Sequence, residues 1–368
     1  MSTLLTDLQT PCLVVDLAAV RSNLATMARM LGGELDRWRP HVKTCKVPEV
    51  LATLLAIGVR HFKCATSREA HVLLSLAREP IDLLVAIAHH GANLRRVGEL
   101  AAAFPQHRLS ILTEDPAHAD GVRATSNSLG LFVDLDPGYG RSGIPLDQTA
   151  RIVATLRSAG DALRGVQCYE GHLRGDDDAR RSGVRAVLDR LTAKLGSMPI
   201  ADPAALEVVT SGTPTFQHAL RDDRLAGYRH RVSPGTVVYW DTTSADFQIP
   251  GFTPAATVLS TVIAAPRTDR ISCDAGSKTL DAACGDPCAA VVGHPHLHAR
   301  TPSEEHLPLE RVGEGPMPGL GDRLRLVPKH VCPTVNLADE AVLVDGERFV
   351  DVVPVRARGH EVLRPPLG

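Results

Sequence analysis

A lysine and an arginine occur in segments whose residue types suit the binding of a reactive cofactor. Lys43 ends the sequence RPHVK, and Arg141 lies in the glycine-rich stretch DPGYGRSG. A lysine enclosed by protein loses its proton more easily than a solvated lysine, and a neutral amine is the form that makes a Schiff base. A surface lysine and a solvated arginine are the alternative interpretations.

The segment SGTPT has the composition of an anion-binding turn. Gly212 allows the backbone to approach a ligand, and consecutive N–H groups from Ser211 to Thr213 can surround a phosphate. An ordinary turn before Pro214 is the alternative. The glycine-rich stretch at 136–143 is not a P-loop, because no GK[ST] follows it.

A histidine and a cysteine in KHVCPTVN could bind a metal ion. His330 and Cys332 are two positions apart, so on a strand they would face the same side. Imidazole and thiolate suit zinc, and two protein ligands would leave positions open for water or substrate. An incidental buried pair is the alternative. We expect HPHLH at 294–298 to be an exposed loop, and Cys284 and Cys288 to have no role in the chemistry.

The elements that must position these residues alternate in type. Between residue 35 and about residue 241, eight short apolar runs alternate with amphipathic helical segments. This pattern predicts an α/β fold, a (β/α)8 TIM barrel, in which reactive groups lie at the carboxyl ends of the strands. A doubly wound sheet is the competing interpretation, although no GxGxxG follows the first run. We predict that the loops after the seventh and eighth strands bind phosphate.

The texture of the sequence changes after residue 250. Short β-branched runs broken by Gly and Pro predict a mainly antiparallel β domain, with which PCLVVDL near the N-terminus could pair. We therefore predict a barrel over residues 20–245, and a β domain made of residues 1–19 and 246–368 that carries the metal pair.

Composition excludes several classes of protein. A net charge of −2 and 4% aromatic residues give no reason to expect nucleic acid as a partner. No apolar stretch approaches the roughly 20 residues that span a bilayer, and the N-terminus lacks the pattern of a secretory signal. We expect a cytoplasmic protein whose eight scattered cysteines are free thiols or metal ligands.

In order along the chain, RPHVKT, DPGYGRSG, CYEGH, SGTPT, VSPGTVVYWD, DAGSK, SEEH and HVCPTVN resemble the D-serine dehydratase and D-threonine aldolase family. These are fold-type III pyridoxal-phosphate enzymes related to alanine racemase. The resemblance runs from residue 11 to residue 359. It implies a barrel followed by a β domain, a small amino-acid substrate and a homodimer.

The resemblance also implies roles for individual residues. Lys43 would carry pyridoxal 5'-phosphate as a Schiff base, and Arg141 would face the pyridine nitrogen. Tyr169 and His172 would line the cofactor and the substrate, and the SGTPT backbone would hold the phosphate. Tyr239, in VSPGTVVYWD, is a further candidate for cofactor binding.

A divalent metal near the substrate is the second implied cofactor, with His330 and Cys332 as its ligands. Zinc is the expected metal, and manganese and magnesium are alternatives. The chain departs from the family at Cys45, where a second histidine is usual, and in CYEGH, where YDGH is usual. Both departures bear on substrate preference.

Within this family an HxC pair resembles the dehydratases and an HxD pair the aldolases. Cys332 therefore favours a dehydratase that converts D-serine or 3-hydroxyaspartate into a 2-oxo acid and ammonia, with Lys43 as the Cα base. The alternative is an aldolase that cleaves D-threonine or a similar amino acid, with His172 as a base. A non-catalytic pyridoxal-phosphate barrel would lack the β domain. Alanine racemase would need a tyrosine after residue 250, and this chain has none.

Overall fold

The computed structural model describes residues 7–362. Its contacts divide the chain into two compact units. The β unit comprises Met1–Met27, Thr44–Thr53 and Thr236–Arg358, and the barrel unit comprises Ala28–Lys43, Leu54–Gly235 and Gly359–Gly368. The predicted limits of the two domains stay a prediction. Residues 1–6, which we expect to carry no secretory signal, and residues 363–368 lie outside the described range.

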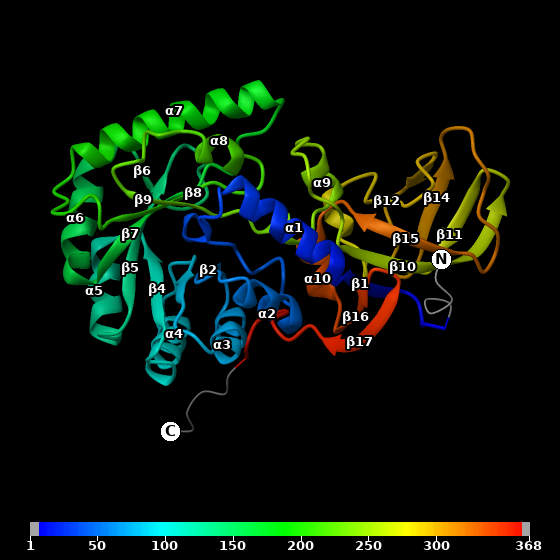
Figure 1. Cartoon of the computed structure of the whole chain (residues 1–368), viewed down its shortest axis with the longest axis horizontal. Helices are drawn as coiled ribbons and strands as arrows, with labels where there is room; N and C mark the ends of the chain where they lie inside the picture. Colours follow the sequence, from blue (N-terminus) through cyan, green and yellow to red (C-terminus); the bar gives the residue numbers. More distant parts are fainter. Residues whose placement is uncertain (1–6, 363–368) are drawn as a thin grey trace. The chain divides into compact units, whose positions relative to one another are not determined.

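The barrel unit is a curled parallel sheet with helices outside it (Figure 1), which confirms the predicted fold class. Its strands, in spatial order, are β2 (His61–Cys64), β3 (Asp82–Val85), β4 (Arg108–Thr113), β5 (Gly130–Asp136), β7 (Leu163–Cys168), β8 (Glu207–Thr210) and β9 (Arg229–Val232), and β6 (Ile144–Pro145) pairs with β5. The helices are α3 (Ser67–Leu76), α4 (Gly91–Ala103), α5 (Pro116–Thr125), α6 (Thr149–Ala159), α7 (Asp177–Gly196) and α8 (Phe216–Leu220).

Side chains at the starts of these helices explain where they begin. Thr66 accepts the Glu69 N–H before α3, while the Glu69 carboxylate accepts the Ala65 N–H. Asp115 and Asp176 cap α5 and α7 in the same way. Each cap satisfies a backbone donor that the first helical turn leaves unpaired.

The first predicted strand, which ends in RPHVKT, does not form a regular strand. Two isolated parallel bridges take its place, Trp38 with Val232 in β9 and His41 with Lys63 in β2. The Lys63 N–H donates to the Pro40 carbonyl at 2.9 Å, and the Val42 N–H donates to the Lys63 carbonyl at 2.7 Å. Pro40 has no N–H and so interrupts the ladder. The segment nevertheless occupies the first strand position of the barrel and joins β9 to β2.

The last predicted strand is also displaced. We expected it within VSPGTVVYWD, whereas β9 ends at Val232, immediately before Ser233-Pro234-Gly235. Residues Thr236–Val238 form a 3-10 turn, and Thr242–Ala245 form the short helix α9. Proline and glycine end the strand because neither supports a continued ladder.

Buried charges occupy the amino-terminal end of the barrel strands. Arg39 is fully buried, and its guanidinium donates to Glu207 at 2.6 and 2.9 Å and to Asp82 at 3.0 Å. Arg231 donates to the same Glu207 carboxylate at 2.6 Å. A buried charge is tolerated when it is paired and hydrogen-bonded, as these are.

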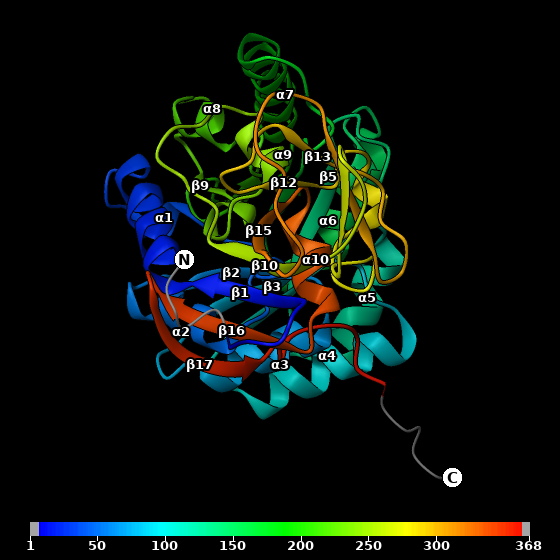
Figure 2. The ribbon, with the colours of Figure 1, turned by 90° about the vertical axis from the view of Figure 1, so that its right-hand side faces the viewer.

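The β unit is a nine-stranded sheet whose pairs are antiparallel except for β1 with β16, so the predicted second architecture is also confirmed. Figure 2 shows β16 between β1 and β17. The strands are β1 (Cys12–Asp16), β10 (Ala256–Arg267), β11 (Arg270–Cys273), β12 (Ala289–Val291), β13 (Leu297–Ala299), β14 (Leu307–Arg311), β15 (Arg323–Pro328), β16 (Glu340–Asp345) and β17 (Arg348–Pro354). The expected pairing of PCLVVDL is present, because β1 lies between β10 and β16.

The other helices of the described chain are α1 (Leu17–Met30), α2 (Pro48–Ala56) and α10 (Val331–Leu337). The α10 helix corrects our placement of HVCPTVN on a strand. His330 is its N-cap residue and Cys332 lies in its first turn, where Pro333 is tolerated. Among the described residues, no helix is both long enough and apolar enough to cross a membrane.

Candidate active site

Lys43 lies in the turn that follows the barrel-closing segment. Its side chain is exposed, and its backbone N–H donates to His41 Nδ1 at 3.3 Å. The bridge between His41 and Lys63 holds the preceding residues at the edge of β2. The chain therefore places Lys43 after the carboxyl-terminal end of the first barrel position, the end at which barrels carry reactive groups.

A second lysine, which sequence reasoning missed, lies inside the barrel. Lys63 is buried, and its Nζ donates to Gln167 Oε1 at 3.3 Å. Gln167 in turn donates to Asp134 at 3.0 Å, and Ser142 donates to the same carboxylate at 2.9 Å. Burial, followed by the nearby charge of Lys43, lowers the pKa of Lys63 to about 7. The signal was a lysine in the middle of the buried strand HFKC.

The arginine of DPGYGRSG lies between two aromatic rings. The Arg141 guanidinium carbon is 4.8 Å from the centre of the Tyr139 ring and 4.9 Å from that of Tyr169. Tyr139 also stacks on His172, with ring centres 5.4 Å apart. The structure thus brings three predicted residues together and adds Tyr139, which we had not singled out. Burial raises the pKa of Tyr169.

His172 has an unused nitrogen in this cluster. Its Nδ1 is buried and has no hydrogen-bond partner among the residues that the structure describes. A buried polar atom without a partner is uncommon in folded proteins. Nδ1 is therefore available to a ligand.

The SGTPT turn differs from the expected anion nest at its first residue. The Ser211 N–H donates to Glu170 Oε2 at 3.1 Å, and the Thr215 hydroxyl donates to Glu170 Oε1 at 2.8 Å. Glu170 is buried, and Ser211 adopts a left-handed backbone with φ of 64°. The Glu170 carboxylate therefore shapes the turn. It accepts the Ser211 N–H, which is one of the donors that we had assigned to phosphate.

Gly212 allows a close approach, although to a side chain of the protein itself. A Cβ atom at this position would lie 2.9 Å from Cε2 and 3.1 Å from the hydroxyl of Tyr169. Those separations are shorter than an ordinary van der Waals contact. Glycine here lets the turn pack directly on the ring of Tyr169.

Two backbone donors of the barrel unit fit an anion. Within residues 7–362, the N–H groups of Thr213 and Gly235 have no acceptor, and both residues are buried. Buried N–H groups are nearly always bonded, so these two suit a ligand that accepts hydrogen bonds. They follow the seventh and eighth strand positions, where barrels commonly hold phosphate.

Tyr239 belongs to the β unit and is fully buried. Its hydroxyl donates to the Cys45 carbonyl at 2.8 Å, and burial raises its pKa well above the usual range. This bond fixes the segment that carries Cys45. The proposed contact of Tyr239 with the cofactor stays a prediction.

The predicted metal pair is in contact in the β unit. A hydrogen bond between His330 and Cys332 is the main cause of the raised pKa of His330. The Cys332 sulfur also lies 3.1 Å from the Thr44 hydroxyl, and His330 Nδ1 lies 3.3 Å from Asp281 Oδ2. The described residues contain no group of three or more His, Cys, Asp or Glu side chains arranged to hold a metal.

Asp241 holds the start of the helix that carries Cys332. Its carboxylate accepts the Val331 N–H at 3.0 Å and the Ser244 N–H at 2.8 Å, so it caps both α10 and α9. Burial is the main cause of its raised pKa. The start of α10, and with it Cys332, is held by this buried acid.

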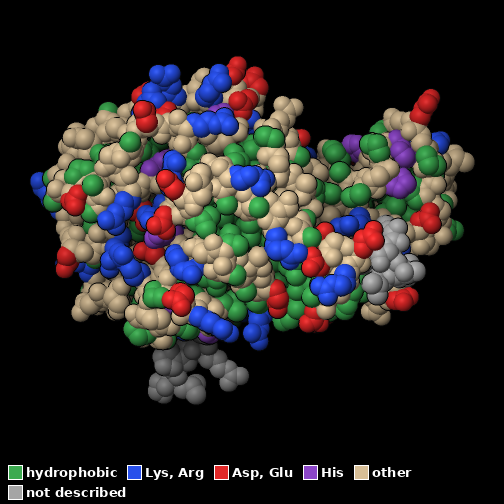
Figure 3. All heavy atoms as spheres, viewed as in Figure 1, with side chains coloured by type: hydrophobic (Ala, Val, Ile, Leu, Met, Phe, Trp, Pro, Cys, Tyr) green, Lys and Arg blue, Asp and Glu red, His purple; other side chains and the backbone are tan. Residues whose placement is uncertain are grey.

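The remaining polar motifs have structural partners. Figure 3 shows histidine side chains at the surface of the β unit. In HPHLH the three histidines are partly exposed. His296 bonds to the Pro316 carbonyl and His298 pairs with Asp286, while Leu297–Ala299 form β13, so the predicted loop is partly strand. None of the eight cysteines forms a disulfide within the described part of the chain.

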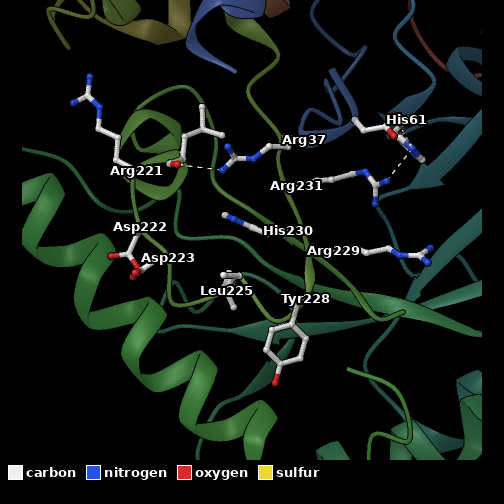
Figure 4. Close-up of a pocket in the computed structure, with 13 residues that line it drawn as sticks. Arg37, His61, Arg221, Asp222, Asp223, Leu225, Tyr228, Arg229, His230 and Arg231 are labelled. Atoms are coloured by element: carbon white, nitrogen blue, oxygen red, sulfur yellow. Dashed lines mark hydrogen bonds and ion pairs between the residues drawn. The ribbon is translucent and has the colours of Figure 1, made fainter. Parts of the chain in front are cut away.

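A cavity of about 740 Å³ opens at the amino-terminal edge of the barrel strands (Figure 4). None of the predicted site residues lines it. Its lining contains four arginines and three aspartates, so its charges nearly balance: Arg37, Arg221, Arg229, Arg231, Asp36, Asp222 and Asp223. Conserved chemistry in barrels is built at the opposite edge, and the candidate site remains the one around Lys43 and Arg141.

Comparison with known proteins gives a consistent result. Residues 15–243 match the model of the alanine racemase N-terminal domain, and residues 255–344 match that of a putative serine dehydratase domain. The chain is 30% identical over 370 residues to a D-threonine aldolase of Arthrobacter, covering 96% of this chain and 94% of that protein. It is 28% identical over 282 residues to D-threo-3-hydroxyaspartate dehydratase of Delftia, which covers 71% of this chain and 69% of that protein. A crystal structure of D-threonine aldolase from Filomicrobium marinum superposes with a TM-score of 0.80 at 25% identity. The superposition covers 96% of this chain and 97% of that one.

Proposed function

Because the chain belongs to the pyridoxal-phosphate-dependent family of lyases that contains D-threonine aldolase and 3-hydroxyaspartate dehydratase, we propose that it is an aldolase acting on a D-3-hydroxy amino acid. The products would be glycine and an aldehyde. The similarity to the Arthrobacter aldolase, which extends over 96% of the chain, carries this proposal. From Cys332 alone we had expected a dehydratase first and an aldolase second, and the proposal now places the aldolase first.

The barrel unit offers groups that fit the cofactor. Lys43 would hold it covalently, Arg141 and Tyr169 would contact its ring, and the N–H groups of Thr213 and Gly235 would bind its phosphate. Pyridoxal phosphate supplies, when bound, an acceptor for the electron pair released at Cα. Arg141 only donates hydrogen bonds, so it would keep the pyridine nitrogen unprotonated.

His172 is the proposed base. Its unpartnered Nδ1 supports this role, because a neutral imidazole nitrogen can accept the proton of the substrate β-hydroxyl. As that proton leaves, the Cα–Cβ bond breaks, the β-carbon departs as an aldehyde and Cα keeps the electron pair. Lys43 would then deliver a proton to Cα to complete glycine.

His330 and Cys332 are the residues that would hold a divalent metal. Their mutual contact supports the assignment, and a thiolate favours zinc over magnesium. A metal there would act as a Lewis acid toward a hydroxyl group. The other members of its coordination sphere would be water or substrate, since the described residues offer two ligands.

A dehydratase is the second candidate, and Cys332 is the observation that favours it. In that reaction Lys43 would remove the Cα proton, and the β-hydroxyl would leave as water after protonation. Hydrolysis of the remaining enamine would yield a 2-oxo acid and ammonia. A homodimer and a cytoplasmic location stay predictions.

Product analysis separates the two activities. The purified protein, loaded with pyridoxal phosphate and zinc, is incubated with D-threonine, D-serine and D-threo-3-hydroxyaspartate. Glycine and aldehyde without ammonia support the aldolase, and ammonia with a 2-oxo acid overturns it in favour of the dehydratase. Lys43→Ala should lose the borohydride-reducible chromophore, whereas Lys194→Ala, on the outer helix α7, should keep it.

A further inference from the structure

Asp281 lies beside the proposed metal ligand His330 although no motif marks it. Its Oδ2 is 3.3 Å from His330 Nδ1. The Asp281 side chain is 13% exposed, whereas that of His330 is 49% exposed. The carboxylate therefore belongs to the protein interior, and the imidazole extends from it toward solvent.

The backbone and carboxylate of Asp281 are held by several bonds. Its N–H donates to Thr334 Oγ1 at 3.4 Å, and the Thr334 hydroxyl donates to the His330 carbonyl at 3.0 Å. Its Oδ1 accepts the Ala283 N–H at 3.0 Å, and its carbonyl accepts the Cys284 thiol at 2.8 Å. Thr334 thus links the backbone of Asp281 to that of His330, and Oδ2 is left for the imidazole.

We propose that Asp281 is a positioning residue for the metal, which orients His330 through Nδ1 so that Nε2 can bind the ion together with the Cys332 thiolate. The inference rests on the proposed metal site. Histidine ligands usually donate their second ring N–H to a carboxylate, which fixes the tautomer and the direction of the ring.

A nearby pair provides a comparison. His298 contacts Asp286, which lies in the same segment as Asp281, yet Asp286 also pairs with Arg300 at 3.4 Å. Within the described range, the side-chain partner of His298 is Asp286 and no thiol bonds to the ring, whereas His330 contacts Cys332. The two pairs share one type of contact and differ in the presence of a second ligand, so Asp286 is a matched control.

Cobalt(II) is a suitable probe because a cobalt–thiolate bond absorbs in the near ultraviolet. The full-length protein loaded with pyridoxal phosphate is titrated with cobalt(II) and then with zinc(II) in competition. The variants are Asp281→Asn, Asp286→Asn and Cys332→Ser, each checked for folding by circular dichroism and thermal unfolding. The readout is a dissociation constant and a spectrum, neither of which depends on turnover.

We expect Asp281→Asn to weaken metal binding about 10- to 100-fold, with the charge-transfer band recovered at saturating cobalt. Asp286→Asn should bind like the unmodified protein, and Cys332→Ser should lose the band. Unchanged affinity in a folded Asp281→Asn protein overturns the role of Asp281. If the unmodified protein shows no Cys332-dependent band, the metal site of the proposed function fails instead. If Asp281→Asn does not fold, Asp281→Glu, which keeps the carboxylate, must bind more tightly than a folded Asp281→Ala, or the inference is wrong.

Discussion

The hydroxyl of Thr44 lies 3.1 Å from the sulfur of Cys332, 288 positions later in the sequence. Thr44 directly follows Lys43 in the chain. The residue after the proposed cofactor lysine is therefore a neighbour of a proposed metal ligand. A donor at this distance stabilises a thiolate, which is the form of cysteine that binds metals.

Thr44→Val should weaken metal binding without changing the shape of the site. A hydrogen bond contributes about 1 kcal/mol, which corresponds to roughly a fivefold rise in the metal dissociation constant. The matched control is Thr236→Val, since Thr236 Oγ1 lies 4.0 Å from the same sulfur. Equal effects of the two substitutions in zinc competition would contradict a specific role for Thr44.

Lys63 should make the stability of the protein depend on pH. Its pKa is lowered from 10.5 to about 7, so between these values the unfolded chain binds more protons than the folded one. The folded state is penalised most at pH 7 and below, and the penalty fades as the pH approaches 10.5.

The test compares Lys63→Met with the unmodified protein in urea at pH 8 and pH 9. Between pH 8 and pH 9 the free energy of unfolding of the unmodified protein should rise, relative to that of the variant, by about 1.4 kcal/mol. A difference that stays constant between the two pH values would show that Lys63 is charged in the folded state.

Glu207→Gln should destabilise the barrel unit strongly. The substitution removes the charge that faces Arg39 and Arg231 and leaves two buried guanidinium groups poorly compensated. Breaking a buried pair from one side costs about 3–5 kcal/mol, and urea unfolding measures it. Glu310→Gln, which removes the partner of Arg300 and Arg270 at the surface, should change little. Similar losses for both would contradict the special role of the buried network.

Gly212→Ala should weaken cofactor binding. The added methyl group would lie 2.9 Å from the Tyr169 ring, so the ring or the turn must move. Overpacking of this kind costs about 1–3 kcal/mol, and the affinity for pyridoxal phosphate should fall at least several-fold, as measured by absorbance titration. Gly227→Ala, where a Cβ meets nothing within 4 Å, is the control and should bind normally. Normal binding by the Gly212→Ala protein would contradict a role of this turn in binding the cofactor.

The barrel and the β architecture could be predicted because period, strand spacing and glycine placement are local signals. Errors arose where local patterns compete with proline. Pro40 reduces the first strand to two bridges, and Pro333 fits the first turn of a helix where we expected a strand. Asp281 and Glu170 could not be found from spacing, since their roles depend on contacts with residues far along the chain. Lys63 looked ordinary because burial, not sequence, lowers its pKa.

The position of β1 between β10 and β16 affects how the protein is made. Residues 12–16 leave the ribosome well before their partners at 256–259 and 341–344. Strand pairing over such a sequence separation is slow, and β1 can pair with β16 only after residue 344 has been synthesised. Until those partners are made, the apolar strand Leu13-Val14-Val15 lacks the strands that flank it in the sheet, and a chaperone that binds short apolar segments can act there.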